Sequence, residues 1–109
     1  MIQFHEYLQQ SSTVIVQSPK EMIGGPAALE FNTLIRDLSE KYSTVIVDLS
    51  STSIMNSSGL GMLVSAHTTL TKLQKRFVLC NVPNSIVKLL SMTKLDSIFD
   101  ISATVESAL

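Results

Sequence analysis

The run Thr44 to Leu49 constrains the fold most, because it is β-branched, continuous and flanked by polar residues. Such a run is typical of a strand buried on both faces, as found in parallel sheets. It is followed by a polar turn and then by a helical pattern that begins at two serines. A buried strand leading directly into a helix predicts an α/β fold with parallel crossovers.

The rest of the chain alternates in the same way. Two β-prone pieces, residues 2–8 and 13–17, are separated by polar residues that suit a hairpin. A further strand is expected at 77–82 and a short one at 98–101, with one or two closing helical turns over 102–109. Three segments carry apolar residues at helical spacing. Their inward residues are Ala28, Phe31, Leu34, Ile35 and Leu38; Leu60, Leu63, Val64, Ala66, Leu70 and Leu73; and Ile86, Val87, Leu89 and Leu90.

Composition narrows the function classes. The 109 residues suit one domain with one core, and a net charge of −1 excludes the basic surplus of a nucleic-acid binder. No apolar stretch approaches the roughly 20 residues of a membrane span, and the amino terminus lacks a signal-peptide pattern. Cys80 stands alone, which excludes a disulfide framework and disfavours a cysteine-based metal site. We therefore expect a cytoplasmic protein without membrane insertion.

The start of the helix after residue 56 is the candidate site. Asn56, Ser57 and Ser58 are good N-cap residues, each worth about 1 kcal/mol to a helix. A helix start also exposes unpaired N–H groups and the positive end of the dipole, which would receive a phosphoryl group on a serine. Capping alone explains these residues too, with Gly59 and Gly61 allowing close packing. The two interpretations are compatible, and the spacing favours a covalent switch over a catalytic pocket.

The sequence offers little support for a catalytic site at the two serines. A serine nucleophile needs a base, and the histidines are His5 and His67. His67 lies nine residues or more beyond the serines on the same helix, more than about 10 Å along its axis, and is expected at the rim of the core. His5 belongs to the first predicted strand, and the sequence leaves its distance from the serines open. Neither a Gly-x-Ser-x-Gly elbow nor a phosphate-binding loop is present. Asp48 is expected to be solvated or capping rather than an ion ligand. We expect no enzyme, metal or cofactor.

The segments Val45–Ser50 and Asn56–Leu63 resemble the core of the STAS domain family, above all the stand-alone anti-sigma-factor antagonists of bacterial partner-switching systems. The similarity continues through residues 76–82 and 86–90 and ends with 92–99 and 106–109. It implies a single STAS domain over 1–109. The implied fold is a mixed sheet of four to five strands with about four helices packed mainly on one face.

The resemblance also implies a function. In that family the first serine of Asp-Ser-Ser/Thr-Gly, here Ser57, is phosphorylated by a serine/threonine kinase of the anti-sigma type that is also the binding partner. The unphosphorylated protein binds this partner and frees whatever the partner held, and a metal-dependent serine/threonine phosphatase resets the switch. The partner surface is expected at the helix start, and Met62 would serve equally as a packing residue. The predicted contacts are Asn56, Ser57, Ser58, Gly59, Leu60, Gly61 and Met62.

Two departures from the family pattern bear on the choice of partner, and the first of them keeps an alternative open. Asn56 stands where the family has Asp, and Ser18–Met22 replaces a Gly-Glu-Leu-Asp-like turn near the site. The alternative is a constitutive STAS subunit of a membrane transport complex of the lipid-transport type, which would not be phosphorylated.

Overall fold

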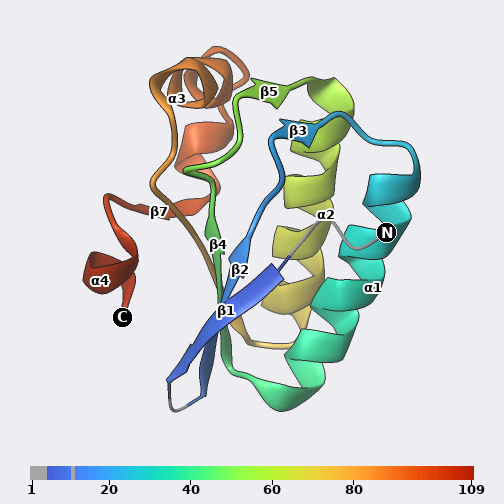
Figure 1. Ribbon diagram of the computed structural model, residues 1–109, viewed down its shortest axis with the longest axis vertical. Coiled ribbons are helices and arrows are strands. Elements are labelled where there is room, and N and C mark those ends of the chain that lie inside the picture. The colour runs from blue at the N-terminus through green and yellow to red at the C-terminus, as the bar shows by residue number, and fades with distance from the viewer. Residues whose placement is uncertain (1–4, 11) are drawn as a thin grey trace.

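A central mixed sheet organises the molecule. The computed structural model describes residues 5–10 and 12–109. The strand order is β1-β2-β4-β6-β7, with β1 antiparallel to β2 and the other neighbours parallel (Figure 1). The strands are β1 (His5–Gln10), β2 (Thr13–Gln17), β4 (Thr44–Asp48), β6 (Arg76–Cys80) and β7 (Asp100–Ser102). The predicted α/β class, opening hairpin and parallel crossovers are confirmed; residues 2–4 of the predicted first strand lie outside the described residues.

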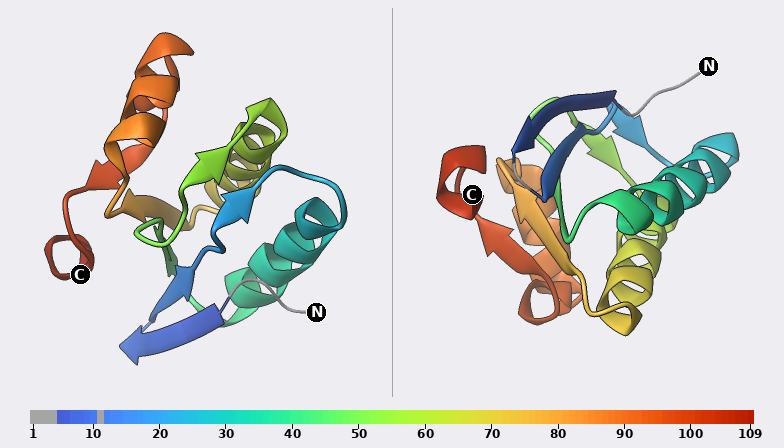
Figure 2. Two further views of the ribbon diagram at one scale, coloured as in Figure 1. Left: turned by 45° about the horizontal axis from the view of Figure 1, so that its top comes forward. Right: turned by 90° about the horizontal axis from the view of Figure 1, so that it is seen from below.

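Helices cover mainly one face of this sheet, as predicted. They are α1 (Pro26–Lys41), α2 (Ser57–Lys72), α3 (Asn84–Met92) and α4 (Val105–Ala108), with a 3₁₀ turn η1 (Leu95–Ser97) after α3. The right-hand view of Figure 2 shows α1 and α2 on one side of the sheet and α4 on the other. No helix in the described part of the chain is long and apolar enough to cross a bilayer.

Alternation along the strands creates two apolar layers. In β4, Val45 and Val47 belong to the large core under α1, α2 and α3, whereas Ile46 belongs to a smaller cluster that includes Val105 of α4. The side chains of Val45, Ile46 and Val47 have no exposed surface. The prediction that this strand is buried on both faces is therefore confirmed.

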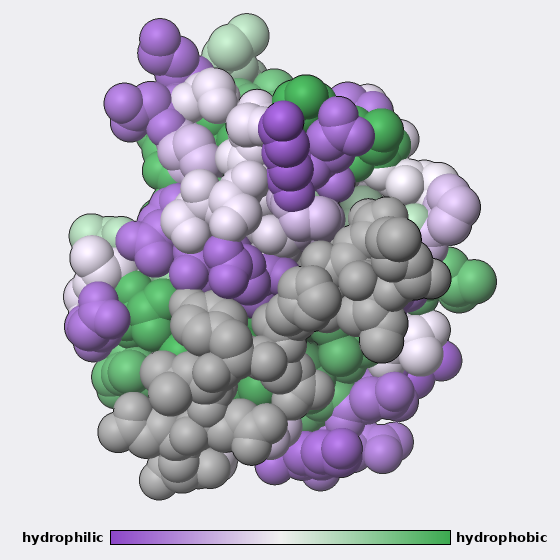
Figure 3. All heavy atoms as spheres, viewed as in Figure 1, coloured by the Kyte–Doolittle hydropathy of each residue, from purple (hydrophilic) through white to green (hydrophobic). Residues whose placement is uncertain are grey.

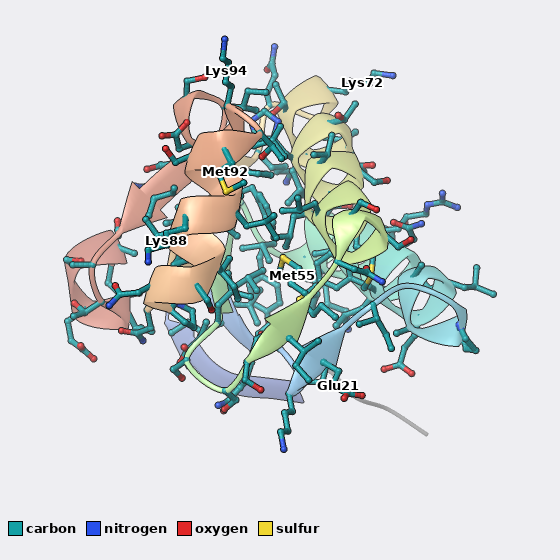
Figure 4. The ribbon with its side chains drawn as sticks, turned by 90° about the horizontal axis from the view of Figure 1, so that it is seen from above. Glu21, Met55, Lys72, Lys88, Met92 and Lys94 are labelled. Atoms are coloured by element: carbon teal, nitrogen blue, oxygen red, sulfur yellow. The ribbon has the colours of Figure 1, made fainter. Side chains whose placement is uncertain are left out.

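A second, very small sheet was not predicted. The strands β3 (Glu21–Met22) and β5 (Ile54–Met55) pair in parallel, beside the end of α2 that carries Ser57 (Figure 1). Met22 is fully buried, and Met55 is half-buried against the core. Figure 4 shows Met55 pointing inward and Glu21 pointing away from the body. The small sheet thus forms a platform on which α2 begins.

Two residues predicted to face inward are exposed. The first is Leu73, the C-cap of α2, which is 51% exposed. The second lies in α3. Ile86 and Leu90 of α3 are buried and Leu89 is partly buried, as expected, but Val87 is 45% exposed. Residues 86 and 90 stand one helical turn apart and define the side that meets the core. Val87 lies about 100° around the helix from Ile86, so it falls outside this narrow face.

Candidate functional site at the start of α2

Asn56 caps α2 in the manner that the sequence predicts. Its side-chain Oδ1 accepts a hydrogen bond from the N–H of Gly59 at 2.9 Å. Ser57 and Ser58 are the first two helical residues, and both are exposed. The helix then continues because Leu60 and Leu63 bury their side chains in the core. The two serines therefore stand at the helix start, as expected.

Ser57 exposes its side chain at the first residue of α2. Among the residues that the structure describes, no hydrogen bond engages the side chain of Ser57 or that of Ser58. A serine nucleophile would be paired with a base, as in a serine–histidine couple, and Ser57 has no such pairing among the described side chains. Its hydroxyl faces solvent at a helix end where backbone N–H groups lack helical partners.

The two serines differ in their surroundings. A Cβ built on Gly24, in the loop between β3 and α1, would lie 2.7 Å from the Cβ and 3.3 Å from the Oγ of Ser58. Ser58 therefore rests against the backbone of this loop. The loop also flanks an open hollow of about 660 Å³ beside the site. The residues that line it are Pro19, Lys20, Glu21, Ile23, Gly24, Pro26 and Ala27.

The remaining predicted contact residues divide between surface and core. Gly61 is exposed with nothing near its Cβ position, whereas Gly59 is buried against the backbone of Met22. Leu60 and Met62 are only 5% and 4% exposed and pack in the core. The contact of Leu60 and Met62 with a partner stays a prediction, and in the unbound domain their side chains serve as packing residues. The surface of the site comprises Asn56, Ser57, Ser58 and Gly61.

The surface around these residues is mixed in character. In Figure 3 the upper part of the molecule, where β3, β5 and α3 lie in Figure 1, carries strongly polar side chains among weakly polar and apolar ones. Two apolar side chains of the small sheet and its loop, Ile23 and Ile54, are 48% and 46% exposed. The site thus offers both hydrogen-bonding groups and apolar surface.

A buried polar network holds the segment that leads to the site. Thr52 is 1% exposed, and its hydroxyl donates to the carbonyl oxygen of Pro19 at 2.6 Å and meets the hydroxyl of Ser18. The hydroxyl of Ser18 also reaches the backbone oxygen of Asp48 at 3.2 Å. This network was not predicted, because the residues that are hydrogen-bonded to each other in it lie 30 or more positions apart in the sequence.

Asp48 was expected to be solvated or capping, and in the structure it is a buried capping residue. Only 6% of Asp48 is exposed. Its Oδ1 accepts from the N–H of Ser50 at 2.9 Å and from the amide of Asn81 at 3.2 Å. Asn81 adopts φ +52°, a conformation that asparagine tolerates better than most residues. The two side chains therefore join the ends of β4 and β6.

His67 and Cys80, two further side chains that could react or bind a metal, are half-buried and buried, respectively. His67 is half-buried and meets Phe99 edge to face at 5.7 Å, as expected for the rim of the core. Burial, with the charges of Asp48 and Glu106, raises the pKa of the Cys80 thiol to about 12. The described residues contain no group of three or more histidine, cysteine or acidic side chains placed to hold a metal ion.

The family follows from a comparison with known proteins. The STAS domain model matches residues 6–108. The chain belongs to the STAS domain family.

Solved structures share the fold of this STAS domain at low sequence identity. A putative anti-sigma factor antagonist from Thermotoga maritima is 23% identical with a TM-score of 0.82, over 96% of this chain and 90% of that one. The anti-sigma factor antagonist SpoIIAA in its unphosphorylated form is 20% identical with a TM-score of 0.72, over 94% and 90%. The Bacillus cell fate determinant SpoIIAA in its phosphorylated form is 21% identical with a TM-score of 0.74, over 96% and 95%.

Proposed function

We propose that this STAS domain is a phosphorylation-switched regulatory binding protein of the anti-sigma-factor-antagonist type, and that Ser57 is its phosphorylation site. The unphosphorylated form would bind a serine/threonine kinase of the anti-sigma type and release that partner's target. A metal-dependent phosphatase would reset it. The observation that carries the proposal is the exposed side chain of Ser57 at the first residue of α2, with no hydrogen bond to its hydroxyl from any described residue. This role is a binding role in the bacterial cytoplasm and not an enzymatic one.

The chemistry of a helix start supports a charge switch. A phosphate on Ser57 would add about 1.5–2 negative charges at neutral pH. The unpaired N–H groups of the first turn and the helix dipole would stabilise it locally. An apolar or acidic partner surface would be repelled, and each 1.4 kcal/mol or so of repulsion weakens binding about tenfold. The switch needs no rearrangement of the core.

Packing favours Ser57 over its neighbour as the modified residue. Ser58 lies against Gly24, so a phosphoryl group on Ser58 would have to clear the loop backbone. Ser57 is the first helical residue and is exposed. Both are serines, so a kinase that discriminates between them here must do so by position.

The test is phosphorylation by the serine kinase encoded nearest to this protein's gene, with ATP, followed by mass spectrometry. We expect one phosphate, lost in Ser57→Ala and retained in Ser58→Ala, which serves as the matched control. Ser57→Asp should weaken kinase binding at least about tenfold in a calorimetric titration. A phosphate on another residue would overturn the site assignment, and unchanged affinity of Ser57→Asp would overturn the switch.

Asn56 favours a second candidate, a constitutive STAS subunit of a membrane transport complex of the lipid-transport type. The family pattern has an acidic residue at this position, and Asn56 is neutral. This candidate predicts stable co-purification with a transporter's ATPase subunit and no phosphate on Ser57. Affinity purification from cells followed by intact-mass analysis separates the two candidates.

A further inference from the structure

Asn56 joins two segments of the molecule through the oxygen and the nitrogen of its side-chain amide. Its Oδ1 accepts from the N–H of Gly59 at 2.9 Å, within α2. Its Nδ2 donates to the carbonyl oxygen of Ile23 at 3.3 Å, in the loop between β3 and α1. Its backbone N–H donates to the carbonyl oxygen of Met22 at 3.4 Å. One residue therefore caps the helix and fastens the loop to it.

The fastened loop is conformationally unusual and presents an apolar side chain. Gly24 and Gly25 have φ values of +88° and +67°, so neither position suits an L side chain that could anchor the loop. Gly24 touches Ser58, the neighbour of the proposed phosphorylation site. Ile23 is 48% exposed on the same loop. The position of Ile23 relative to Ser57 therefore depends on the contacts between this loop and the first turn of α2.

We propose that Asn56 is a positioning residue: its amide holds the loop 23–25 against α2, so that a partner recognising Ser57 also meets Ile23 in a fixed place. This inference rests on the proposed function of Ser57 for its biological use. The local geometry on which it depends stands independently of phosphorylation.

The amide meets this requirement and a carboxylate does not. An ionised Asp at position 56 is an acceptor only, so it would keep the cap on Gly59 but could not donate to Ile23. It would also place a negative oxygen where the amide nitrogen now lies, 3.3 Å from the carbonyl oxygen of Ile23. The two oxygens would repel each other. The neutral residue that departs from the family pattern thus gives this chain a contact that the family residue would lack.

The first test measures the loop without any partner. Backbone order parameters from NMR relaxation should place Gly24 and Gly25 in the rigid range, about 0.85, in the unmodified protein. In Asn56→Asp and Asn56→Ser we expect both to fall below about 0.6. Serine caps a helix about as well as asparagine, but its single Oγ cannot occupy the positions of Oδ1 and Nδ2 at once, so it separates loop fastening from capping. Asn84→Asp, at the exposed first residue of α3, is the matched control and should change neither value.

The second test is a double-mutant cycle on kinase affinity, using the kinase that phosphorylates Ser57. Ile23→Ala should weaken binding about tenfold in the otherwise unmodified protein. In the Asn56→Ser background the same change should weaken it less than about threefold, because Ile23 is no longer held in place. An additive cycle, or unchanged order parameters in both Asn56 variants, overturns the inference.

The two proposals fail separately. If the order parameters fall as expected but Ser57 receives no phosphate, the proposed switch is wrong and the loop fastening stands. If Ser57 is phosphorylated while the loop stays rigid in both Asn56 variants, the switch stands and Asn56 is only a cap.

Discussion

Gly59 of α2 lies against the carbonyl oxygen of Met22 so closely that a Cβ built on it would stand 1.9 Å from that oxygen. No side chain fits at that distance. The helix that carries Ser57 therefore rests directly on the backbone of β3, and glycine at position 59 is what allows it.

Replacing Gly59 with alanine should destabilise the protein by about 1–3 kcal/mol or more, because α2 must move off β3 to make room. Gly61→Ala is the matched control: it lies in the same helix, is exposed and has nothing within 4 Å of its Cβ position. The control should gain up to about 1 kcal/mol from better helix propensity. Urea denaturation measures both, and equal stability of the two variants would contradict the packing described.

The hydroxyl group of Thr52 should contribute more to the stability of the fold than the volume of its side chain does. Thr52→Val keeps the volume but removes the donor to Pro19 and the contact with Ser18. Leaving buried polar groups unpaired costs about 1–3 kcal/mol. Thr52→Ser retains the hydroxyl and should restore part of that loss in thermal unfolding. If valine proves as stable as threonine, the network does not hold the segment before α2.

Cys80 should make stability fall at alkaline pH. The thiol pKa is raised from 9.0 to about 12 in the folded protein, mainly by burial, with contributions from Asp48 and Glu106. Between these values the unfolded chain loses a proton that the folded chain keeps, so rising pH favours unfolding by up to about 1.4 kcal/mol per unit. This stabilising effect is fully present below pH 9.0 and is lost toward pH 12.

The measurement is the free energy of unfolding at pH 8–11 in the unmodified protein and in Cys80→Ala, taken as a difference to remove the other titrating groups. The difference should shrink as the pH rises. A thiol reagent should also leave Cys80 unmodified at pH 8 until urea unfolds the chain. Rapid labelling of the folded protein would show that the thiol is accessible.

The short helix α4 should depend on its capping box. Thr104 accepts from the N–H of Ser107 at 3.1 Å, and the hydroxyl of Ser107 accepts from the N–H of Thr104 at 3.1 Å. Thr104→Ala should cost about 1 kcal/mol in chemical denaturation. Ser107→Ala, which keeps the cap itself, should cost less. Equal and negligible effects would mean that burial of Val105 and Ala108 alone holds α4.

Local sequence patterns predicted the strands and helices whose buried residues follow a recognisable pattern along the chain. The continuous β-branched run of β4 predicted a buried strand, and the helical spacing of Phe31, Ile35 and Leu38 predicted the buried face of α1. The start of α2 was also predictable, because the cap at Asn56 acts within three residues.

Features that join distant segments were not predictable. The strands β3 and β5 have two residues each, too few for any periodic pattern, and they form because the fold brings Met22 beside Met55, 33 positions further along the chain. The local cap of Asp48 on Ser50 was among the expected roles, but its burial and its bond to Asn81 were not, because Asn81 lies 33 residues away. Val87 was expected to be buried because its side chain is apolar. Residue type alone does not show that the buried side of α3 is a narrow one, defined by Ile86 and Leu90.

The alternation of covered and uncovered positions at the start of α2 has a consequence for how this protein can diversify. Ser57, Ser58 and Gly61 are exposed, whereas Gly59, Leu60 and Met62 are committed to packing. Related chains can therefore vary the first group while the second is held by the fold. Tolerance to substitution should rise and fall from residue to residue along one helical turn, and a saturation library over positions 57–62 would display it.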